Sequence, residues 1–173
     1  IDIVRRKNAD LKNAFDQLNK YAKNNYVAEQ SAVFDVREAI DAVYESLSPD
    51  CEANGILLVR EDEYPVYVYD KKMCLINVLN NLVMNAIEHA ECTQIRLSAV
   101  RRRGRCLLAV SDNGKGIRAE DDPFAAYVTE GVNGENLGLG LYICRSLVGS
   151  MSGTLDYDYR DGNLTFTISL PIS

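Results

Sequence analysis

The sequence predicts an α+β fold, a two-layer sandwich in which helices cover one face of a mixed sheet. Three observations support this prediction. Apolar residues recur at helical spacing in several segments, short β-rich segments lie between them, and two strand pairs are joined by glycine-containing turns. The chain has 173 residues, 47% apolar and 25% charged, which is typical of a globular protein with one main domain.

The N-terminal segment from Ile3 to about Ala28 has a single apolar stripe, with spacings of seven, four and three residues. The stripe is formed by Val4, Leu11, Phe15, Leu18 and Tyr21. Such a narrow stripe predicts an amphipathic helix that pairs with another helix, in the same chain or in a dimer. Packing on its own domain is the alternative. We therefore divide the chain into residues 1–30, which hold this helix, and residues 31–173, the main domain.

The first half of the main domain alternates helices and strands. Helices are predicted over residues 34–47 and 71–90, and strands over residues 56–60 and 66–69. Asp35 is placed to cap the first helix, which is expected to end at Ser48-Pro49. Asp70 is placed to cap the second.

The second half contains two predicted hairpins and one helix. The hairpins pair residues 95–100 with 106–111 and residues 154–159 with 164–170, and the helix covers residues 139–151. Asp161-Gly162 is a strong turn signal for the second hairpin. After Ile117 the pattern fails for about twenty residues, which predicts a functional lid or a disordered loop.

Charge and cysteine content narrow the function classes. A formal net charge of −6 argues against a nucleic-acid partner. The basic run from Arg101 to Arg105 surrounds Gly104 between two strand-like segments, and we interpret it as a solvated hairpin turn. Five widely spaced cysteines without a Cys-x-x-Cys pair favour reduced core thiols in a cytosolic compartment over disulfides or a zinc site: Cys51, Cys74, Cys92, Cys106 and Cys144.

No stretch of the sequence approaches the roughly 18 to 20 apolar residues of a membrane-spanning helix, and Ile1 to Asp10 is charged rather than signal-like. We therefore expect a cytoplasmic location for this segment. Because the first residue is Ile rather than Met, the sequence is interpreted as a fragment, and upstream segments of the full protein could anchor it in a membrane.

A row of asparagines marks one face of the second long helix. Asn77, Asn81 and Asn85 are four residues apart, and Glu88 and His89 extend the row, while apolar residues occupy the other faces. Buried amides are costly unless each finds a partner. The row is therefore either a solvated helix face or a ligand-facing stripe, in which an amide oxygen coordinates Mg²⁺ beside bound phosphates.

A glycine-containing loop follows the first predicted hairpin directly. Gly114 and Gly116 allow a tight turn or a close approach of the backbone to a ligand. Asp112, at the strand end, is a fixed acceptor for an exocyclic amine such as that of adenine. A turn alone would explain the two glycines about equally well.

A second glycine-containing segment, Gly134 to Leu141, opens a predicted helix. Free backbone N–H groups and the positive end of the helix dipole attract anions there, and Gly138 and Gly140 leave room for a phosphate. Glycines also cap and hinge helices, so this signal is weak alone. The segment is neither a Walker motif, because no Gly-Lys-Ser/Thr follows, nor a dinucleotide fingerprint after a first strand.

Together these motifs resemble the ATP-binding domain shared by histidine kinases, gyrase, the Hsp90 chaperones and MutL, which has the Bergerat-type fold. Residues 81–89 resemble its asparagine box, residues 112–117 its first glycine box and residues 138–141 its second. Pro123-Phe124 resembles the phenylalanine segment at the start of its lid. The resemblance extends from about Phe34 to Ile172.

The resemblance implies a site for ATP and Mg²⁺. Asn85 would ligate Mg²⁺, Asp112 would receive the adenine amine, and residues 118–137 would form the mobile lid. Asn81 and His89 are candidates for a catalytic role as well as for binding. The implied nucleotide-binding residues are Asn81, Asn85, His89, Asp112, Gly114, Gly116, Ile117, Gly138, Leu139, Gly140, Leu141 and Thr165.

Hydrolysing members of this family resemble each other in having a Glu general base four residues before the Mg²⁺ asparagine, whereas this chain has Asn81. Asn81 matches the kinase pattern, in which the phosphoryl group passes to a histidine on a separate helical hairpin. His89 is the single histidine of the chain, so that phosphoacceptor is expected upstream of Ile1 or on another chain.

The resemblance thus implies the catalytic domain of a two-component sensor histidine kinase. Residues 1–30 would be the second helix of the dimerising hairpin of a homodimer, and a response regulator receiver domain would be the partner. Two alternatives stay open, an ATPase or serine kinase of the same fold and a non-catalytic nucleotide-binding module. Asn136-Leu137 and Glu88 depart from the residues frequent at these positions in the family, which keeps the second alternative open.

Overall fold

The computed structural model describes residues 30–62, 65–117, 122–124 and 140–173. The helix predicted over residues 3–28 and most of the predicted lid lie outside these described residues. Residues Ser31–Ser173 belong to one compact unit, which contains every helix and strand described below.

Three helices and seven strands make up the described part of this unit. They are β1 (Ala32–Asp35), α2 (Val36–Ala53), β2 (Leu57–Asp62), β3 (Tyr67–Asp70), α3 (Lys72–His89), β4 (Gln94–Arg102), β5 (Arg105–Asp112), α4 (Gly140–Ser150), β6 (Thr154–Arg160) and β7 (Asn163–Pro171). Five strands form a mixed sheet in the order β2-β4-β5-β7-β6, and β1 pairs separately with β3. Only the β2–β4 pair among these is parallel.

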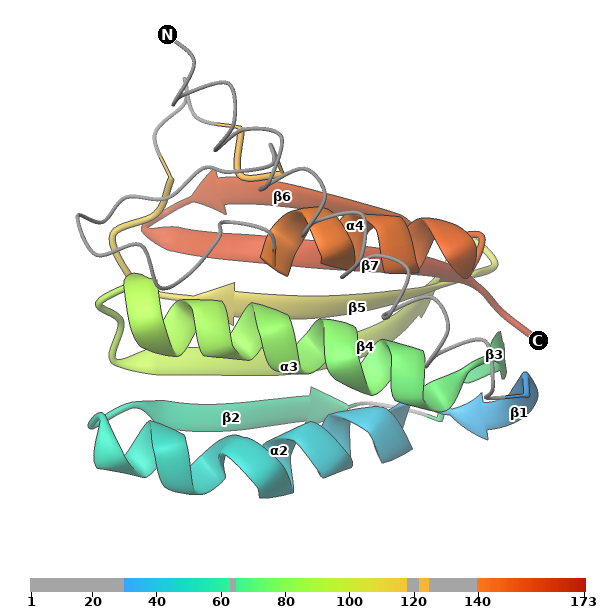
Figure 1. Ribbon diagram of the computed structural model, residues 1–173, viewed down its shortest axis with the longest axis horizontal. Coiled ribbons are helices and arrows are strands. Elements are labelled where there is room, and N and C mark those ends of the chain that lie inside the picture. Colours follow the sequence, from blue (N-terminus) through green and yellow to red (C-terminus); the bar gives the residue numbers. More distant parts are fainter. Residues whose placement is uncertain (1–29, 63–64, 118–121, 125–139) are drawn as a thin grey trace, which may run out of the picture. The chain divides into compact units, whose positions relative to one another are not determined.

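The three helices lie side by side over one face of the sheet (Figure 1). Strand alternation supplies the apolar surface beneath them, because every second residue of a strand points to the same face. In β5, Cys106, Leu108, Val110 and Asp112 are buried, while the intervening residues are half-buried. The predicted α+β two-layer sandwich is confirmed, and the apolar row of β5 ends in a carboxylate.

Both predicted hairpins are confirmed. The β4–β5 turn has Arg103 and Gly104 at φ 50° and 75°, and the β6–β7 turn has Asp161 and Gly162 at φ 51° and 75°. Two successive residues with positive φ match the twist of the flanking strands, which is why sequences with glycine at the second position favour these turns.

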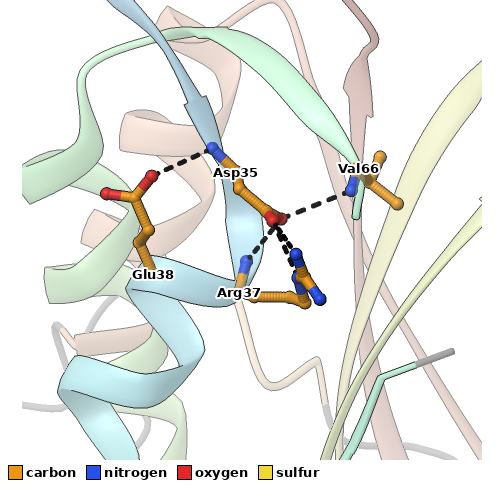
Figure 2. A network of polar contacts seen from close by, with 4 residues as sticks. All are labelled: Asp35, Arg37, Glu38 and Val66. Carbon is orange, nitrogen blue, oxygen red and sulfur yellow. Dashed lines mark hydrogen bonds and ion pairs between the residues drawn. The ribbon is translucent and has the colours of Figure 1, made fainter. Parts of the chain in front are cut away.

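The predicted N-cap of the first helix is confirmed at Asp35 (Figure 2). Asp35 Oδ1 accepts the N–H of Arg37 at 3.1 Å, and Glu38 Oε1 accepts the N–H of Asp35 at 3.3 Å, which completes a capping box. The Arg37 guanidinium and the N–H of Val66 also donate to the Asp35 carboxylate. Burial alone would raise the pKa of Asp35, but these hydrogen bonds outweigh it and lower that pKa.

The predicted end of this helix at Ser48-Pro49 was wrong, because α2 continues to Ala53. Pro49 has no N–H to donate within the helix. Leu47 and Cys51 are nevertheless both buried, and they lie one turn apart, so continuing the helix places Cys51 in the core. Packing therefore outweighs the local cost of the proline, and the helix ends at Asn54, before Gly55 with φ 68°.

The start of α3 also differs from its prediction. Asp70 is the last residue of β3, where it pairs with Ala32 of β1, and it does not cap the helix. The N-cap position is Lys71, without a side-chain cap, and Asp70 Oδ1 accepts the N–H of Lys71 at 2.8 Å. The strand β1 was not predicted, since its four residues precede the helix without a turn signal.

All five cysteines are buried, as the sequence predicted, and none of them is in a disulfide. Burial raises the pKa of the Cys106 and Cys144 thiols to about 12, so both are inert core groups. Within the described residues, none of the helices has the length and hydrophobicity that crossing a bilayer requires.

Candidate nucleotide-binding site

The asparagine row of α3 faces the first residue of α4. A Cβ atom placed on Gly140 would lie 3.9 Å from Asn81 Oδ1 and 4.0 Å from Asn85 Oδ1. One turn further along α4, Cys144 Sγ lies 3.8 Å from the carbonyl oxygen of Val78, so the two helices pack closely. The fold therefore brings together two motifs that are far apart in the sequence.

This junction combines groups that suit a phosphate and its metal ion. The N-terminus of α4 has backbone N–H groups without partners inside the helix, and it carries the positive end of the helix dipole. Asn81 is exposed and its Nδ2 donates to the carbonyl oxygen of Asn77 at 3.0 Å, while Asn85 is half-buried. Since Gly140 has no side chain, nothing from that residue fills the space toward the two amide oxygens.

Asp112 is held at the end of β5, on the face that the helices cover. Its side chain is buried, with 5% of the residue exposed, and Oδ1 accepts the N–H of Gly114 at 2.9 Å. Burial raises the pKa of Asp112, and the hydrogen bond from Gly114 opposes this only in part. Asp112 is thus a buried acceptor whose orientation depends on the following loop.

The loop after β5 is fixed against the end of α3. Lys115 N donates to the carbonyl oxygen of Ala90 at 2.8 Å. A Cβ atom on Gly114 would lie 2.1 Å from that same oxygen, so only glycine fits there. Asn113 Oδ1 accepts the N–H groups of Thr93 and Gln94, each at 2.9 Å. These contacts attach the loop that follows Asp112 to the end of the helix that carries Asn85.

Gly116 contacts an aromatic ring that the sequence analysis did not single out. Its φ is 72°, and a Cβ atom there would lie 2.5 Å from Cε2 of Tyr159 on β6. Ile117, the next residue, is half-buried. Tyr159 was missed because it lies far along the chain and within an ordinary alternating strand, and only the register of β6 reveals its position.

Thr165 is not brought to this site. Asp112 pairs with Leu164 of β7, whereas Thr165 pairs with Ser111, and the two hydroxyl groups lie 2.8 Å apart. Because the faces of a strand alternate, Thr165 lies on the sheet face away from the helices, and Leu164 is the β7 residue beside Asp112. Thr165, which the resemblance implied, is thus the neighbour of the inward-facing residue.

Of the remaining predicted residues, the structure describes His89 and Leu141. His89, the last residue of α3, has an exposed side chain with Nε2 3.6 Å from Glu88 Oε2. Leu141 is half-buried in the first turn of α4. Gly138 and Leu139 lie outside the described residues.

Phe124, at the start of the predicted lid, is buried under α4. Its ring centroid lies 5.7 Å from that of Tyr157 and 6.1 Å from that of Phe166, and the Arg145 guanidinium lies 4.8 Å from its centre. The side chain of Asp122 accepts the N–H of Phe124 at 3.0 Å. These contacts fix one point of the segment between β5 and α4.

No group of three His, Cys, Asp or Glu side chains within the described residues could hold a metal ion. An amide oxygen such as Asn85 Oδ1 can contribute one ligand to Mg²⁺, which takes its remaining ligands from phosphate oxygens and water at nucleotide sites. The residues present therefore fit a metal ion that arrives with a nucleotide.

The fold and this set of residues define a nucleotide-binding domain of the α+β sandwich class. Residues 70–173 match the family described as histidine kinase-, DNA gyrase B-, and HSP90-like ATPase. The chain belongs to this family.

Sensor kinases are among its relatives. The alginate biosynthesis sensor protein KinB of Pseudomonas aeruginosa is 31% identical over 144 residues, which cover 80% of this chain and 24% of KinB. Sensor histidine kinase RcsC of Escherichia coli K12 is 35% identical over 127 residues, which cover 68% of this chain and 13% of RcsC. This chain thus spans a quarter or less of either relative.

A similar solved structure is the catalytic domain of histidine kinase ThkA in a nucleotide-free form. It has a TM-score of 0.74 and 25% sequence identity, and the match covers 82% of this chain and 95% of that domain.

Proposed function

We propose that this chain is the ATP-binding catalytic domain of a two-component sensor histidine kinase. It transfers the γ-phosphoryl group of ATP to a histidine outside residues 1–173, for signalling to the receiver domain of a response regulator. The observation that carries this proposal is the position of Gly140 opposite the amide oxygens of Asn81 and Asn85. A helix N-terminus and an amide row meet there, where phosphates can bind.

Three groups of this chain each bind a different part of the nucleotide. Asp112 accepts a hydrogen bond from the exocyclic amine of adenine, as its buried carboxylate has a free acceptor capacity beyond the Gly114 bond. The N-terminal turn of α4 receives the phosphates. Asn85 would hold Mg²⁺, which supplies neutralisation of phosphate charge when it is bound. Phosphoryl transfer depends mainly on such positioning.

Transfer to a histidine fits this site better than hydrolysis. A hydrolysing site needs a base that activates water, and position 81 holds an asparagine, which cannot take up a proton at neutral pH. The Asn81 amide is moreover bonded to its own helix, at the carbonyl oxygen of Asn77. The acceptor histidine can supply its own basic nitrogen.

The arrangement of the full protein follows from this role. Residues 1–30 are proposed to be the second helix of a dimerising hairpin, because their apolar stripe has the spacing of a helix that pairs with another. We place this domain in the cytoplasm, where ATP and response regulators are found, within a homodimer whose other segments can anchor it to the membrane.

The test is a phosphoryl-transfer assay. The chain is mixed with radiolabelled Mg-ATP and with the histidine-bearing helical hairpin of the same protein. We expect the hairpin to gain an acid-labile, base-stable label, as phosphohistidine does. Asn85→Ala should abolish the label, whereas Asn163→Ala, at the exposed start of β7, should leave it unchanged.

Two outcomes would contradict the proposal. Steady ATP turnover without the hairpin, and no label on it, would show an ATPase of the same fold. A folded chain for which calorimetry detects no Mg²⁺-dependent ATP binding would be a non-catalytic module.

A further inference from the structure

Four residues form a row across the end of the sheet, on the face that the helices cover. Ile95, Asp112, Leu164 and Tyr159 are successive partners on β4, β5, β7 and β6. Ile95, Asp112 and Leu164 are buried, whereas Tyr159, on the edge strand, is 45% exposed. The aromatic ring thus stands at the accessible end of the row that contains the candidate adenine acceptor.

The Tyr159 ring presses on the loop that orients this acceptor. It occupies the space beside the Gly116 Cα, where a Cβ atom would lie 2.5 to 2.8 Å from three of its carbon atoms. The contact is made by the ring carbon atoms Cε2, Cζ and Cδ2. Gly114, two residues earlier in the same loop, donates its N–H to Asp112 Oδ1.

The loop therefore has two supports, on opposite sides. Its first half, from Asn113 to Lys115, is bonded to the end of α3 and the start of β4. Its second half has Tyr159, which is held in place by the tight β6–β7 hairpin. Without the ring, Gly116 with its positive φ would lose its packing partner, and the loop would keep only the support of its first half. The Gly114 N–H, two residues from Gly116, would then be less firmly oriented toward the carboxylate.

We propose that Tyr159 is a positioning residue for nucleobase recognition, which acts through the Gly114–Gly116 loop to aim the Asp112 carboxylate at the exocyclic amine of the base. This inference rests on the proposed binding of ATP. A solely structural tyrosine would stabilise the domain without affecting the choice of base.

The experiment compares two ligands that differ only in the exocyclic amine. Calorimetry measures the affinity for Mg-ATP and for the Mg²⁺ complex of purine riboside triphosphate, which lacks that amine. The wild-type chain should prefer ATP by about tenfold or more, because a hydrogen bond to a charged acceptor depends on the amine. Tyr159→Ala should reduce this preference to less than about threefold, since the coupling between the ring and the amine is lost.

Conservative and control variants complete the test. Tyr159→Phe should keep the wild-type preference for Mg-ATP, because the aromatic ring is retained. Tyr159→Thr removes the ring while it keeps a residue suited to a strand, and it replaces Tyr159→Ala if that variant unfolds. Tyr69→Ala, a 64% exposed tyrosine on β3, should keep the wild-type preference.

The outcomes separate this inference from the proposed function. If the folded wild-type chain binds neither ligand, both fail. If it prefers ATP but a folded Tyr159→Ala or Tyr159→Thr chain keeps that preference, or weakens for both ligands equally, only the positioning role is overturned.

Discussion

Asp112 has an environment that opposes its own ionisation. The residue is 5% exposed, and of its two carboxylate oxygens Oδ1 accepts the N–H of Gly114. Burial raises its pKa, and so the ionised form costs free energy in the folded chain that it does not cost in the unfolded chain. A ligand that donates a hydrogen bond to this carboxylate offsets part of that cost.

Asp112→Asn should therefore gain stability relative to the wild type as the pH rises. Below the unfolded-state pKa both states are protonated, and the wild type bears no cost of ionisation. As the pH rises from the unfolded-state pKa through the higher folded-state pKa, the unfolding free energy of the wild type decreases, because the buried carboxyl group must ionise. Asparagine does not titrate, so the variant does not lose stability in this way. Urea unfolding of both chains between about pH 4 and pH 7 measures the difference. A difference that stays constant or shrinks would contradict the prediction.

Asp35 behaves in the opposite sense. Burial raises the pKa of Asp35, but hydrogen bonds from Arg37 and Val66 lower it by more, so the folded-state pKa lies below the unfolded-state pKa. The stabilising effect of Asp35 is therefore present above the unfolded-state pKa and is lost as the pH falls through the folded-state pKa. Asp35→Ala should cost about 1 kcal/mol or more of unfolding free energy at neutral pH, since it removes the α2 cap.

The exposed ion pair between Asp41 and Arg60 provides the control for this substitution. Asp41→Ala should change the unfolding free energy by less than about 0.5 kcal/mol in the same denaturation assay. Equal changes in unfolding free energy for the two substitutions would show that the Asp35 network stabilises the fold no more than an ordinary surface ion pair does.

Residues with local signals could be singled out from the sequence, and the cap at Asp35 was confirmed. Asp35 precedes an apolar periodic segment with Glu38 at the capping-box position, and Asn85 and Asp112 stand in recognisable local patterns. Tyr159 and Leu164 gave no such signal. Their places beside Gly116 and Asp112 depend on the β5–β7–β6 register, in which a shift of one residue exchanges the two faces. The same alternation separates Thr165, which the resemblance implied, from Leu164 beside Asp112.

At the scale of elements, glycines decide how closely α3, α4 and the loop after β5 approach each other. Gly114→Ala should destabilise the chain by about 2 kcal/mol, because its Cβ would lie 2.1 Å from the Ala90 oxygen. Gly149→Ala should stabilise the chain by about 0.5 to 1 kcal/mol, because Gly149 is in α4 and a Cβ atom placed on it would have nothing within 4 Å. Thermal and urea unfolding measure the stability change of each variant. An unchanged unfolding free energy for Gly114→Ala would contradict the close contact between Gly114 and Ala90.

Gly140→Ala should separate binding from stability. Its Cβ would lie 3.9 to 4.0 Å from the Asn81 and Asn85 oxygens, which is ordinary contact, so the unfolding free energy should change by less than about 1 kcal/mol. The methyl group nevertheless fills the space proposed for phosphate and Mg²⁺. We expect about a tenfold loss of ATP affinity in calorimetry. Unchanged affinity would place the phosphates elsewhere.

The elements themselves were mostly foreseen, because hairpin turns and helical periodicity are local features. The exceptions have nonlocal causes. α2 continues past Pro49 because Cys51 reaches the core, and β3 includes Asp70 because β1 pairs with it. Neither partner can be recognised from the sequence window around the residue concerned.

For the whole molecule, nucleotide binding should be linked to folding. A ligand that binds only the folded chain raises its unfolding free energy, by about 2.7 kcal/mol at a concentration of one hundred times Kd. Mg-ATP should therefore raise the Tm of the chain, and Mg-GTP, whose base lacks an amine at the corresponding carbon, should do so much less. Equal shifts for the two nucleotides would contradict the role of Asp112 in recognising adenine.

The order of strands has a consequence for synthesis. β7 is the last strand of the chain, yet it lies in the interior of the sheet, between β5 and β6. A nascent chain that ends before β7 has already made α3 with its asparagines and Asp112, but it lacks the strand that covers one side of β5. On the ribosome we therefore expect competence for nucleotide binding to arise only when the final hairpin has emerged and inserted into the sheet.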